Sequence, residues 1–276
     1  MNTVDRTLSI LELFTVERPT WAVEEAAKCL GVSTSTAYRY FRSLRKAGLL
    51  DSITSSAYVL GPAIIEYDRQ VQMLDPTVRL ARPVMERLVA QTENAGVALL
   101  CRVYRKCVMC VHQEAPTASN IVSSFERGRL MPLFRGAASK IIFVYLPTRS
   151  IRWFFTNNPG EIANAGLGAD WDAVKSNLRR IRKQGACVTR GEVDRGRVGI
   201  AAPIFAANRS VLGSVSMVLS EREATPQFIA RVCVLVQAAA REIDAALLDL
   251  GRSTDGPDAP MKVSAYNHVS QESTLP

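Results

Sequence analysis

The chain has 276 residues and an apolar fraction of 47%, which is enough for two domains with buried cores, and its net charge is +8. No apolar run approaches the ~20 residues that cross a bilayer, and the N-terminus lacks a signal-peptide pattern, so we expect no membrane anchor and a cytoplasmic location. Six cysteines in a chain of this length do not indicate a disulfide-stabilised scaffold.

The positive charge is spread unevenly along the chain. Residues 1–62 hold seven basic and six acidic side chains, so most of the excess lies in the remainder. Four of those seven basic residues nevertheless fall between Arg39 and Lys46. Such clustering favours contact with an anionic partner, whereas an evenly spread excess is more often a solvated surface.

The first predicted elements form a compact helical unit. Apolar spacing predicts helices over residues 5–14, 23–30 and 35–47. Ala27 and Gly31 are small residues at the positions where a helix-turn-helix brings two helices together and turns the chain. Ser33 or Thr34 can cap the following helix.

A short hairpin is predicted next, with strands at residues 49–53 and 57–60. The pattern of residues 1–62 therefore predicts a winged helix-turn-helix. In such a domain the second helix of the turn motif, here residues 35–47, enters the DNA major groove. Its outward face carries hydroxyl and basic side chains that can contact phosphates and base edges. We expect Ser35, Thr36, Tyr38 and Arg39 to lie at or near the bases, Arg42, Arg45 and Lys46 to contact phosphates, and Tyr40 to be a core residue.

Residues 63–92 are predicted to form a helical linker. Pro62 suits the first turn of one helix, Pro76 follows a break, and Pro83 is expected to kink or restart the second helix. One face of the first linker helix is apolar, with Ile64, Tyr67, Val71 and Leu74 in register, which suits a second copy of the chain.

The rest of the chain alternates between strand and helix patterns. Strands are expected at 97–104, 107–112, 121–125, 188–193, 198–205 and 211–219, and helices at 136–145, 150–155, 171–183 and 226–250. This order predicts an α+β effector domain on an antiparallel sheet over residues 93–250. Residues 251–276 are poor in apolar groups and are predicted to be a disordered tail.

Cys107 and Cys110 form a C-x-x-C pair near His112 and Cys101, which raises the alternative of a metal site. On a strand, side chains three positions apart point to opposite faces, so we favour buried thiols and expect no metal or cofactor.

The order of these parts resembles the IclR family of bacterial transcriptional regulators, from residue 4 to about residue 250. The likeness is carried by six segments in register: VDRTLSILELF, EEAAKCLGVSTSTAYRYFRSLRKAGLL, YVLGP, LARPVMERLVAQT, RLMPLFRGAASKIIFVYLP and RGEVDRGRVGIAAPIF. The resemblance implies a winged helix-turn-helix joined to a GAF-like effector-binding domain. It also implies double-stranded DNA as a partner and a homodimer or a dimer of dimers as the working form.

The resemblance further implies a pocket for a small organic acid, aromatic or aliphatic. The matching positions are Ala137, Ala138, Thr189, Gly199 and Ser216. Phe134 stands where the family usually has histidine and offers a ring for stacking, and the neighbouring Arg135 offers a charge-assisted contact to a carboxylate. Gly199 and Ser139 also depart from the family pattern, which has cysteine and glycine there.

Two other classes of function remain open from the residues. An enzyme with a catalytic C-terminal domain would have His112 as its acid–base candidate, but the sequence has no G-x-S-x-G, phosphate-loop or dinucleotide motif. A winged helix that contacts protein rather than DNA is the third class, and the basic cluster argues against it. We therefore expect a non-enzymatic, ligand-responsive regulator that binds a near-palindromic operator.

Overall fold

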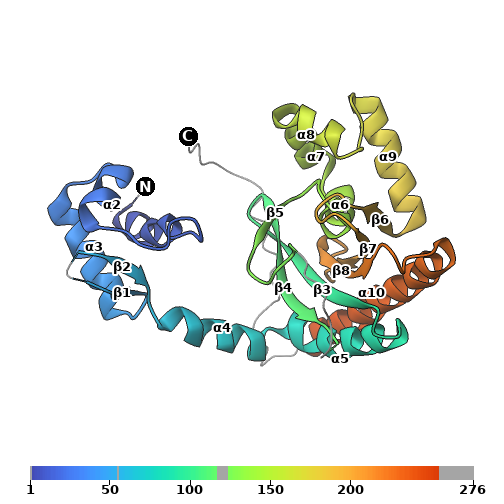
Figure 1. The fold of residues 1–276 in the computed structure, drawn as a ribbon, viewed down its shortest axis with the longest axis horizontal. Helices are drawn as coiled ribbons and strands as arrows, with labels where there is room; N and C mark the ends of the chain where they lie inside the picture. Colours follow the sequence, from blue (N-terminus) through green and yellow to red (C-terminus); the bar gives the residue numbers. More distant parts are fainter. Residues whose placement is uncertain (1, 55, 117–123, 255–276) are drawn as a thin grey trace. The chain divides into compact units, whose positions relative to one another are not determined.

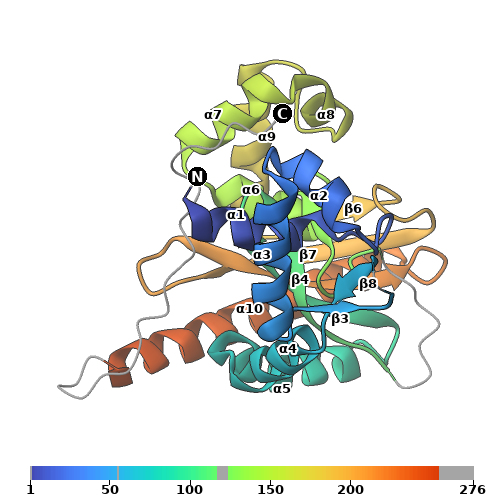
Figure 2. The same ribbon diagram turned by 90° about the vertical axis from the view of Figure 1, so that its left-hand side faces the viewer.

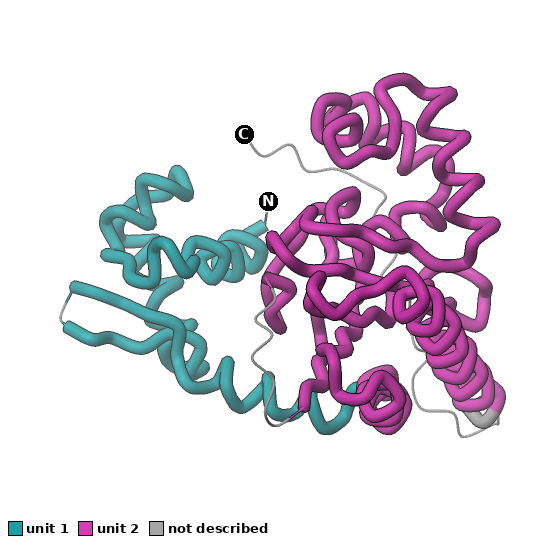
Figure 3. The backbone as a smooth tube through the Cα atoms, turned by 45° about the vertical axis from the view of Figure 1, so that its right-hand side comes forward, with its two compact units in different colours: residues 1–75 teal, residues 76–276 magenta. Residues whose placement is uncertain are grey.

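The computed structural model describes residues 2–54, 56–116 and 124–254. The chain divides into two compact units, residues 1–75 and 76–276 (Figure 3). The predicted linker is shared between them, because its first helix belongs to the first unit and its second helix to the second.

The first unit is a small helical core with a hairpin. Its elements, in chain order, are α1 (Thr3–Ser9), the 3-10 helix η1 (Ile10–Leu13), α2 (Val23–Leu30), α3 (Thr34–Lys46), β1 (Leu50–Ser52), β2 (Tyr58–Leu60) and α4 (Ala63–Leu74). The antiparallel hairpin pairs Leu50 with Leu60, as the sequence pattern predicts.

Residues at the helix ends determine where the two helices of the turn motif end and begin. α2 ends at Gly31, whose φ of 62° is the left-handed conformation that glycine adopts without strain. α3 begins after Ser33, whose side chain accepts a hydrogen bond from the amide of Thr36. Ala27 and Ala37 are both buried, so the two helices pack through small side chains.

The second unit is built on a six-stranded antiparallel sheet with the strand order β5-β4-β3-β8-β7-β6. Its strands are β3 (Gly96–Tyr104), β4 (Cys107–Glu114), β5 (Leu130–Pro132), β6 (Cys187–Arg190), β7 (Arg197–Phe205) and β8 (Val211–Ser220). Its helices are α5 (Pro76–Gln91), α6 (Ala137–Tyr145), α7 (Thr148–Asn157), α8 (Pro159–Asn164), α9 (Trp171–Gln184) and α10 (Pro226–Thr254).

Helices cover both faces of this sheet. α5 and α10 lie side by side on one face, and α6 lies on the opposite face with α7, α8 and α9 beyond it (Figures 1 and 2). Alternating residues of β3 divide accordingly: Leu99 joins the core on the α6 side, whereas Leu100 joins the core on the α5 and α10 side.

Several sequence expectations need correction. α5 continues through Pro83 without a restart, because its buried side chains, including Val78, Met85 and Leu88, hold it against the sheet. Ser124 and Phe125 are not in a strand, and residues 121–123 of that predicted strand lie outside the described residues. β5 and α8 were not predicted, since each is too short to show a period.

The C-terminal helix is longer than expected. α10 extends to Thr254, so the first four residues of the predicted tail are helical, and the rest of that tail lies outside the described residues.

Asp244 on α10 makes the stability of the second unit depend on pH. Its carboxylate accepts a hydrogen bond of 2.7 Å from the amide of Phe205, and burial raises its pKa from 3.8 to about 6. The folded state therefore holds this proton more tightly than the unfolded chain, so the stability contribution is complete below roughly pH 4 and is lost as pH rises through about 6.

We expect Asp244→Asn to stabilise the protein by about 1 kcal/mol at neutral pH, a value reduced for the partial exposure of the group. Asparagine keeps the acceptor and removes the charge. Urea unfolding should show this gain shrinking toward zero near roughly pH 4. The exposed Asp249→Asn on the same helix is the control, and an equal gain in that variant would contradict the assignment to burial.

Candidate DNA interface and effector cavity

α3 separates its core residues from a polar outer face. Ala37, Tyr40, Phe41 and Leu44 are buried against the rest of the first unit. All seven residues predicted to contact DNA lie on the same helix, with Thr36 half-buried and the others exposed: Ser35, Thr36, Tyr38, Arg39, Arg42, Arg45 and Lys46. The sequence prediction of Tyr40 as a core residue is thus matched by its burial.

The basic side chains of α3 are uncompensated. Within the described residues, none of Arg39, Arg42, Arg45 and Lys46 forms an ion pair. Four positive charges on one exposed helix repel one another and are available to phosphate oxygens.

Tyr38 has a partner that the sequence did not indicate. Its hydroxyl donates a hydrogen bond of 2.8 Å to Oε1 of Glu24 on α2. This bond raises the pKa of Tyr38 and lowers the pKa of Glu24. The ring is therefore held at the outer face of α3, where 48% of the residue is exposed.

The N-terminus of α3 presents a cluster of hydroxyls. Ser33 Oγ donates to Thr36 Oγ1 at 2.9 Å and lies 3.1 Å from Ser35 Oγ. Exposed hydroxyls at the start of a helix that enters the major groove can contact base edges as well as phosphates.

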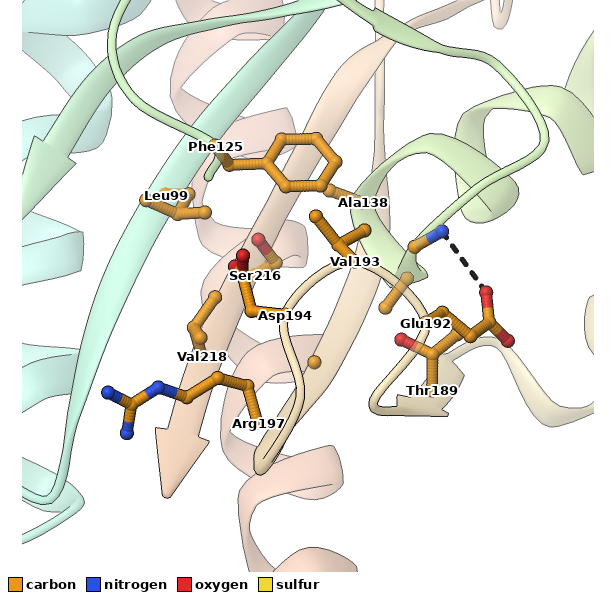
Figure 4. A pocket seen from close by; sticks show the side chains of 13 residues that line it. Leu99, Phe125, Ala138, Thr189, Glu192, Val193, Asp194, Arg197, Ser216 and Val218 are labelled. Atoms are coloured by element: carbon orange, nitrogen blue, oxygen red, sulfur yellow. Dashed lines mark hydrogen bonds between the residues drawn. The ribbon is translucent and has the colours of Figure 1, made fainter. Parts of the chain in front are cut away.

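A cavity of about 40 Å³ lies in the second unit between α6, the sheet and the loop that joins β6 to β7 (Figure 4). Five of the seven predicted effector residues line it: Ala137, Ala138, Thr189, Gly199 and Ser216. The sheet register brings the last three together. Gly199 pairs with Thr189 of β6 on one side, and Ala201, two positions further along the same face of β7, pairs with Ser216 of β8 on the other.

Ser216 presents to this cavity a buried hydroxyl without a hydrogen-bond partner in the described part of the chain. The residue is only 2% exposed, and its Oγ has no hydrogen-bond partner among the described residues. A buried hydroxyl without a partner costs stability, so its presence in a cavity lining indicates a place for a polar ligand atom.

Glycine at position 199 keeps the cavity open. A Cβ atom there would lie 3.2 Å from both Ala137 Cβ and Thr189 Oγ1. The cysteine that the family often has at this position would therefore occupy space that this chain leaves free.

Glu192 closes the polar end of the cavity. Its Oε2 accepts a hydrogen bond of 3.2 Å from the amide of Gly136, at the start of α6, and its Oε1 lies 2.5 Å from Lys140 Nζ (Figure 4, first contact). A carboxylate of the chain itself thus already sits at the positive end of this helix.

Phe134 and Arg135 do not line the cavity. Phe134 is buried in the core with its ring edge-on to Phe143 at 6.4 Å between centroids. Arg135 is exposed, and its Nε donates to the backbone oxygen of Glu192 at 2.8 Å. Arg135 therefore fixes the loop of Glu192 from outside.

Other lining residues were missed by sequence reasoning. Arg197 lies on β7 two positions before Gly199, so strand alternation could have indicated it. Phe125 and Asp194 come from irregular segments, where no period points to a face. Asp194 accepts hydrogen bonds from the amide of Ser124, at 2.8 Å, and from its hydroxyl, which holds the loop beside the cavity.

Of the four residues of the possible metal site, Cys101, Cys110 and His112 are buried in the sheet. Cys110 is buried on β4, opposite Cys101 on β3, while Cys107 is half-buried on the other face of the strand. His112 is also buried, and its Nε2 lies 2.6 Å from Glu114 Oε1. The described residues hold no group of three or more potential metal ligands.

The described residues also include no helix with the length and hydropathy of a membrane span.

Comparison with known proteins finds a family match for each of the two units. The IclR helix-turn-helix domain matches residues 3–52, and the family described as bacterial transcriptional regulator IclR C-terminal matches residues 73–245. The chain is 26% identical to the HTH-type transcriptional regulator KipR of Bacillus subtilis over 243 residues, covering 87% of this chain and 95% of KipR.

Solved structures show the same fold. An IclR transcriptional regulator from Alicyclobacillus acidocaldarius superposes with a TM-score of 0.73 at 19% identity, covering 89% of this chain and 98% of that one. An IclR homolog from Microbacterium hydrocarbonoxydans, in complex with 4-hydroxybenzoate, has a TM-score of 0.66 at 17% identity, with coverages of 89% and 99%. The chain belongs to the IclR family of transcriptional regulators, with a helix-turn-helix DNA-binding domain followed by an effector domain.

Proposed function

We propose that the outer face of α3 reads a near-palindromic operator. The observation that carries this proposal is the row of unpaired cations beside an exposed hydroxyl cluster on one capped helix. Ser35, Thr36, Tyr38 and Arg39 lie toward its N-terminal half and are assigned to bases. Arg42, Arg45 and Lys46 follow and are assigned to phosphates.

The working form is proposed to be a homodimer or a dimer of dimers. α4 leaves Tyr67, Val71 and Leu74 exposed at the spacing of one helical face. A helix face of this kind is stabilised when a second copy covers it. Pairing two modules by a two-fold axis would set two half-sites a whole number of helical turns apart. This regulator would act in the cytoplasm, where bacterial DNA lies.

The effector is proposed to be a small organic acid bound in the cavity beside Ser216. The amides of Ala137 and Ala138 lie in the first turn of α6, where no intrahelical acceptor exists. Together with the Ser216 hydroxyl they can donate hydrogen bonds to a carboxylate. The 4-hydroxybenzoate in a structural neighbour supports an aromatic acid.

The effector cavity is too small for an aromatic acid unless it widens. About 40 Å³ is well below the roughly 150 Å³ that accommodates benzene in a protein core. An aromatic effector must therefore widen the cavity, and we propose that the loop held by Glu192 and Asp194 is the wall that moves. A ligand that favours the widened state shifts the equilibrium between two arrangements, which is how it would alter DNA affinity.

The test is operator binding by the full chain. Fluorescence anisotropy with duplexes from the region upstream of its own gene should give salt-dependent binding, with two chains per dyad-symmetric site. Aromatic acids should raise Tm and change that affinity. Uniform weak binding to every duplex, without a preferred site, would overturn the proposal.

A further inference from the structure

A second and larger cavity lies beside β6, the strand at one edge of the sheet. It has a volume of about 530 Å³ and is lined by parts of α6, α9, β6 and α10 and by the segment 165–167. This volume is within the roughly 300–1,000 Å³ of small-molecule sites, whereas the effector cavity holds about 40 Å³.

The charges of this second cavity favour an anion. Lys140 and Arg180 line it together with a single carboxylate, Glu192. Lys140 is 5% exposed, and its Nζ donates to the backbone oxygen of Ala165 and to Glu192 Oε1, each at 2.5 Å. An ammonium has three donors, so one remains for a ligand.

Arg180 is the exposed partner of this site. Its guanidinium makes a weak contact of 3.3 Å with Asn177 Oδ1, and among the described residues it has no ion pair. The buried ammonium of Lys140 is paired with Glu192, so a ligand acid group would share Lys140 with Glu192 and gain its second cation from Arg180. The apolar part of the wall comes from Leu167, Ile181 and Val188.

We propose that this second cavity binds a small organic anion, with its acid group between Lys140 and Arg180 and its apolar body against Leu167 and Ile181. The site is distinct from the effector cavity, because the two share only Glu192 among their lining residues. This proposal does not depend on the proposed DNA-binding function.

Cys233 reports on occupancy of this site. It lines the second cavity and is half-buried, while Cys29 is exposed on α2 in the other unit and serves as an internal reference. In the full chain, alkylation by iodoacetamide is followed at each cysteine by peptide mass spectrometry. Benzoate is the probe, and its neutral analogue benzamide controls for charge.

We expect benzoate to slow alkylation of Cys233 about tenfold at roughly ten times its Kd, and to leave Cys29 unchanged. Benzamide should protect much less. Arg180→Glu should remove the protection, because it replaces attraction with repulsion. Arg179→Glu, at the neighbouring exposed position outside the cavity lining, should keep it.

Three results would overturn the proposal: no protection in the unaltered protein, equal protection by benzamide, or full protection in Arg180→Glu. Protection that is lost in Gly199→Leu and kept in Arg180→Glu would place benzoate in the effector cavity instead. Operator binding is measured on the same samples, so failure of the proposed DNA function is seen separately.

Discussion

Replacing Arg39 and Arg42 of α3 with alanine is expected to abolish operator binding at physiological salt. A contact to a base is worth about 1–3 kcal/mol, and each phosphate contact adds about 1 to the slope of log affinity against log salt. In a dimer each substitution is present twice on one operator, so the losses double. Both residues are exposed, so folding should be unaffected.

The two single variants separate the two roles. Arg39→Ala should weaken the preferred operator more than unrelated duplexes, since it is assigned to bases. Arg42→Ala should weaken all duplexes alike and reduce the salt slope by about 2 per dimer. Anisotropy titrations over a range of salt concentrations measure both effects.

Arg69→Ala is the matched control, because Arg69 is an exposed arginine on α4 of the same unit, outside α3. An unchanged affinity and salt slope in the double variant would refute the assignment of this face to DNA. An equal loss in Arg69→Ala would show only a general effect of net charge.

The DNA-binding unit could be predicted from sequence because its determinants are local. Gly31 ends one helix, Ser33 caps the next, and the apolar spacing of Ala37, Phe41 and Leu44 defines the buried face. Each of these signals acts over a few residues. The contact between Tyr38 and Glu24 escaped because it joins two helices across fourteen positions.

The effector cavity was accessible mainly through family likeness. Residue types there carry weak signals: two alanines, a glycine and two hydroxyls fit ordinary packing equally well. Their meeting depends on pairing of β6, β7 and β8, which sequence period alone does not fix. Arg135 lies outside the cavity for a different reason, since the loop turns its guanidinium toward the backbone of Glu192.

Two serines on β8 allow the effect of a hydroxyl on ligand binding to be distinguished from its effect on stability. Ser214 and Ser216 lie two positions apart on the same face of the strand, and both are buried. Ser214 Oγ donates to the backbone oxygen of Ala138 at 3.0 Å, whereas Ser216 Oγ has no partner among the described residues and lines the effector cavity. The same substitution at the two sites should therefore have opposite effects.

Ser216→Ala should stabilise the ligand-free protein by about 1 kcal/mol, because it removes a buried hydroxyl without a hydrogen bond. It should also lower the affinity for an aromatic acid by roughly tenfold, as expected for one lost hydrogen bond. The acid to use is the one that most raises Tm of the unaltered protein. Ser214→Ala should cost about 1 kcal/mol and leave ligand affinity unchanged. Urea unfolding and calorimetric titration measure the two quantities. If Ser216→Ala bound the acid as tightly as the unaltered protein, the ligand would not contact this hydroxyl, and the stability cost of Ser216 would need another explanation.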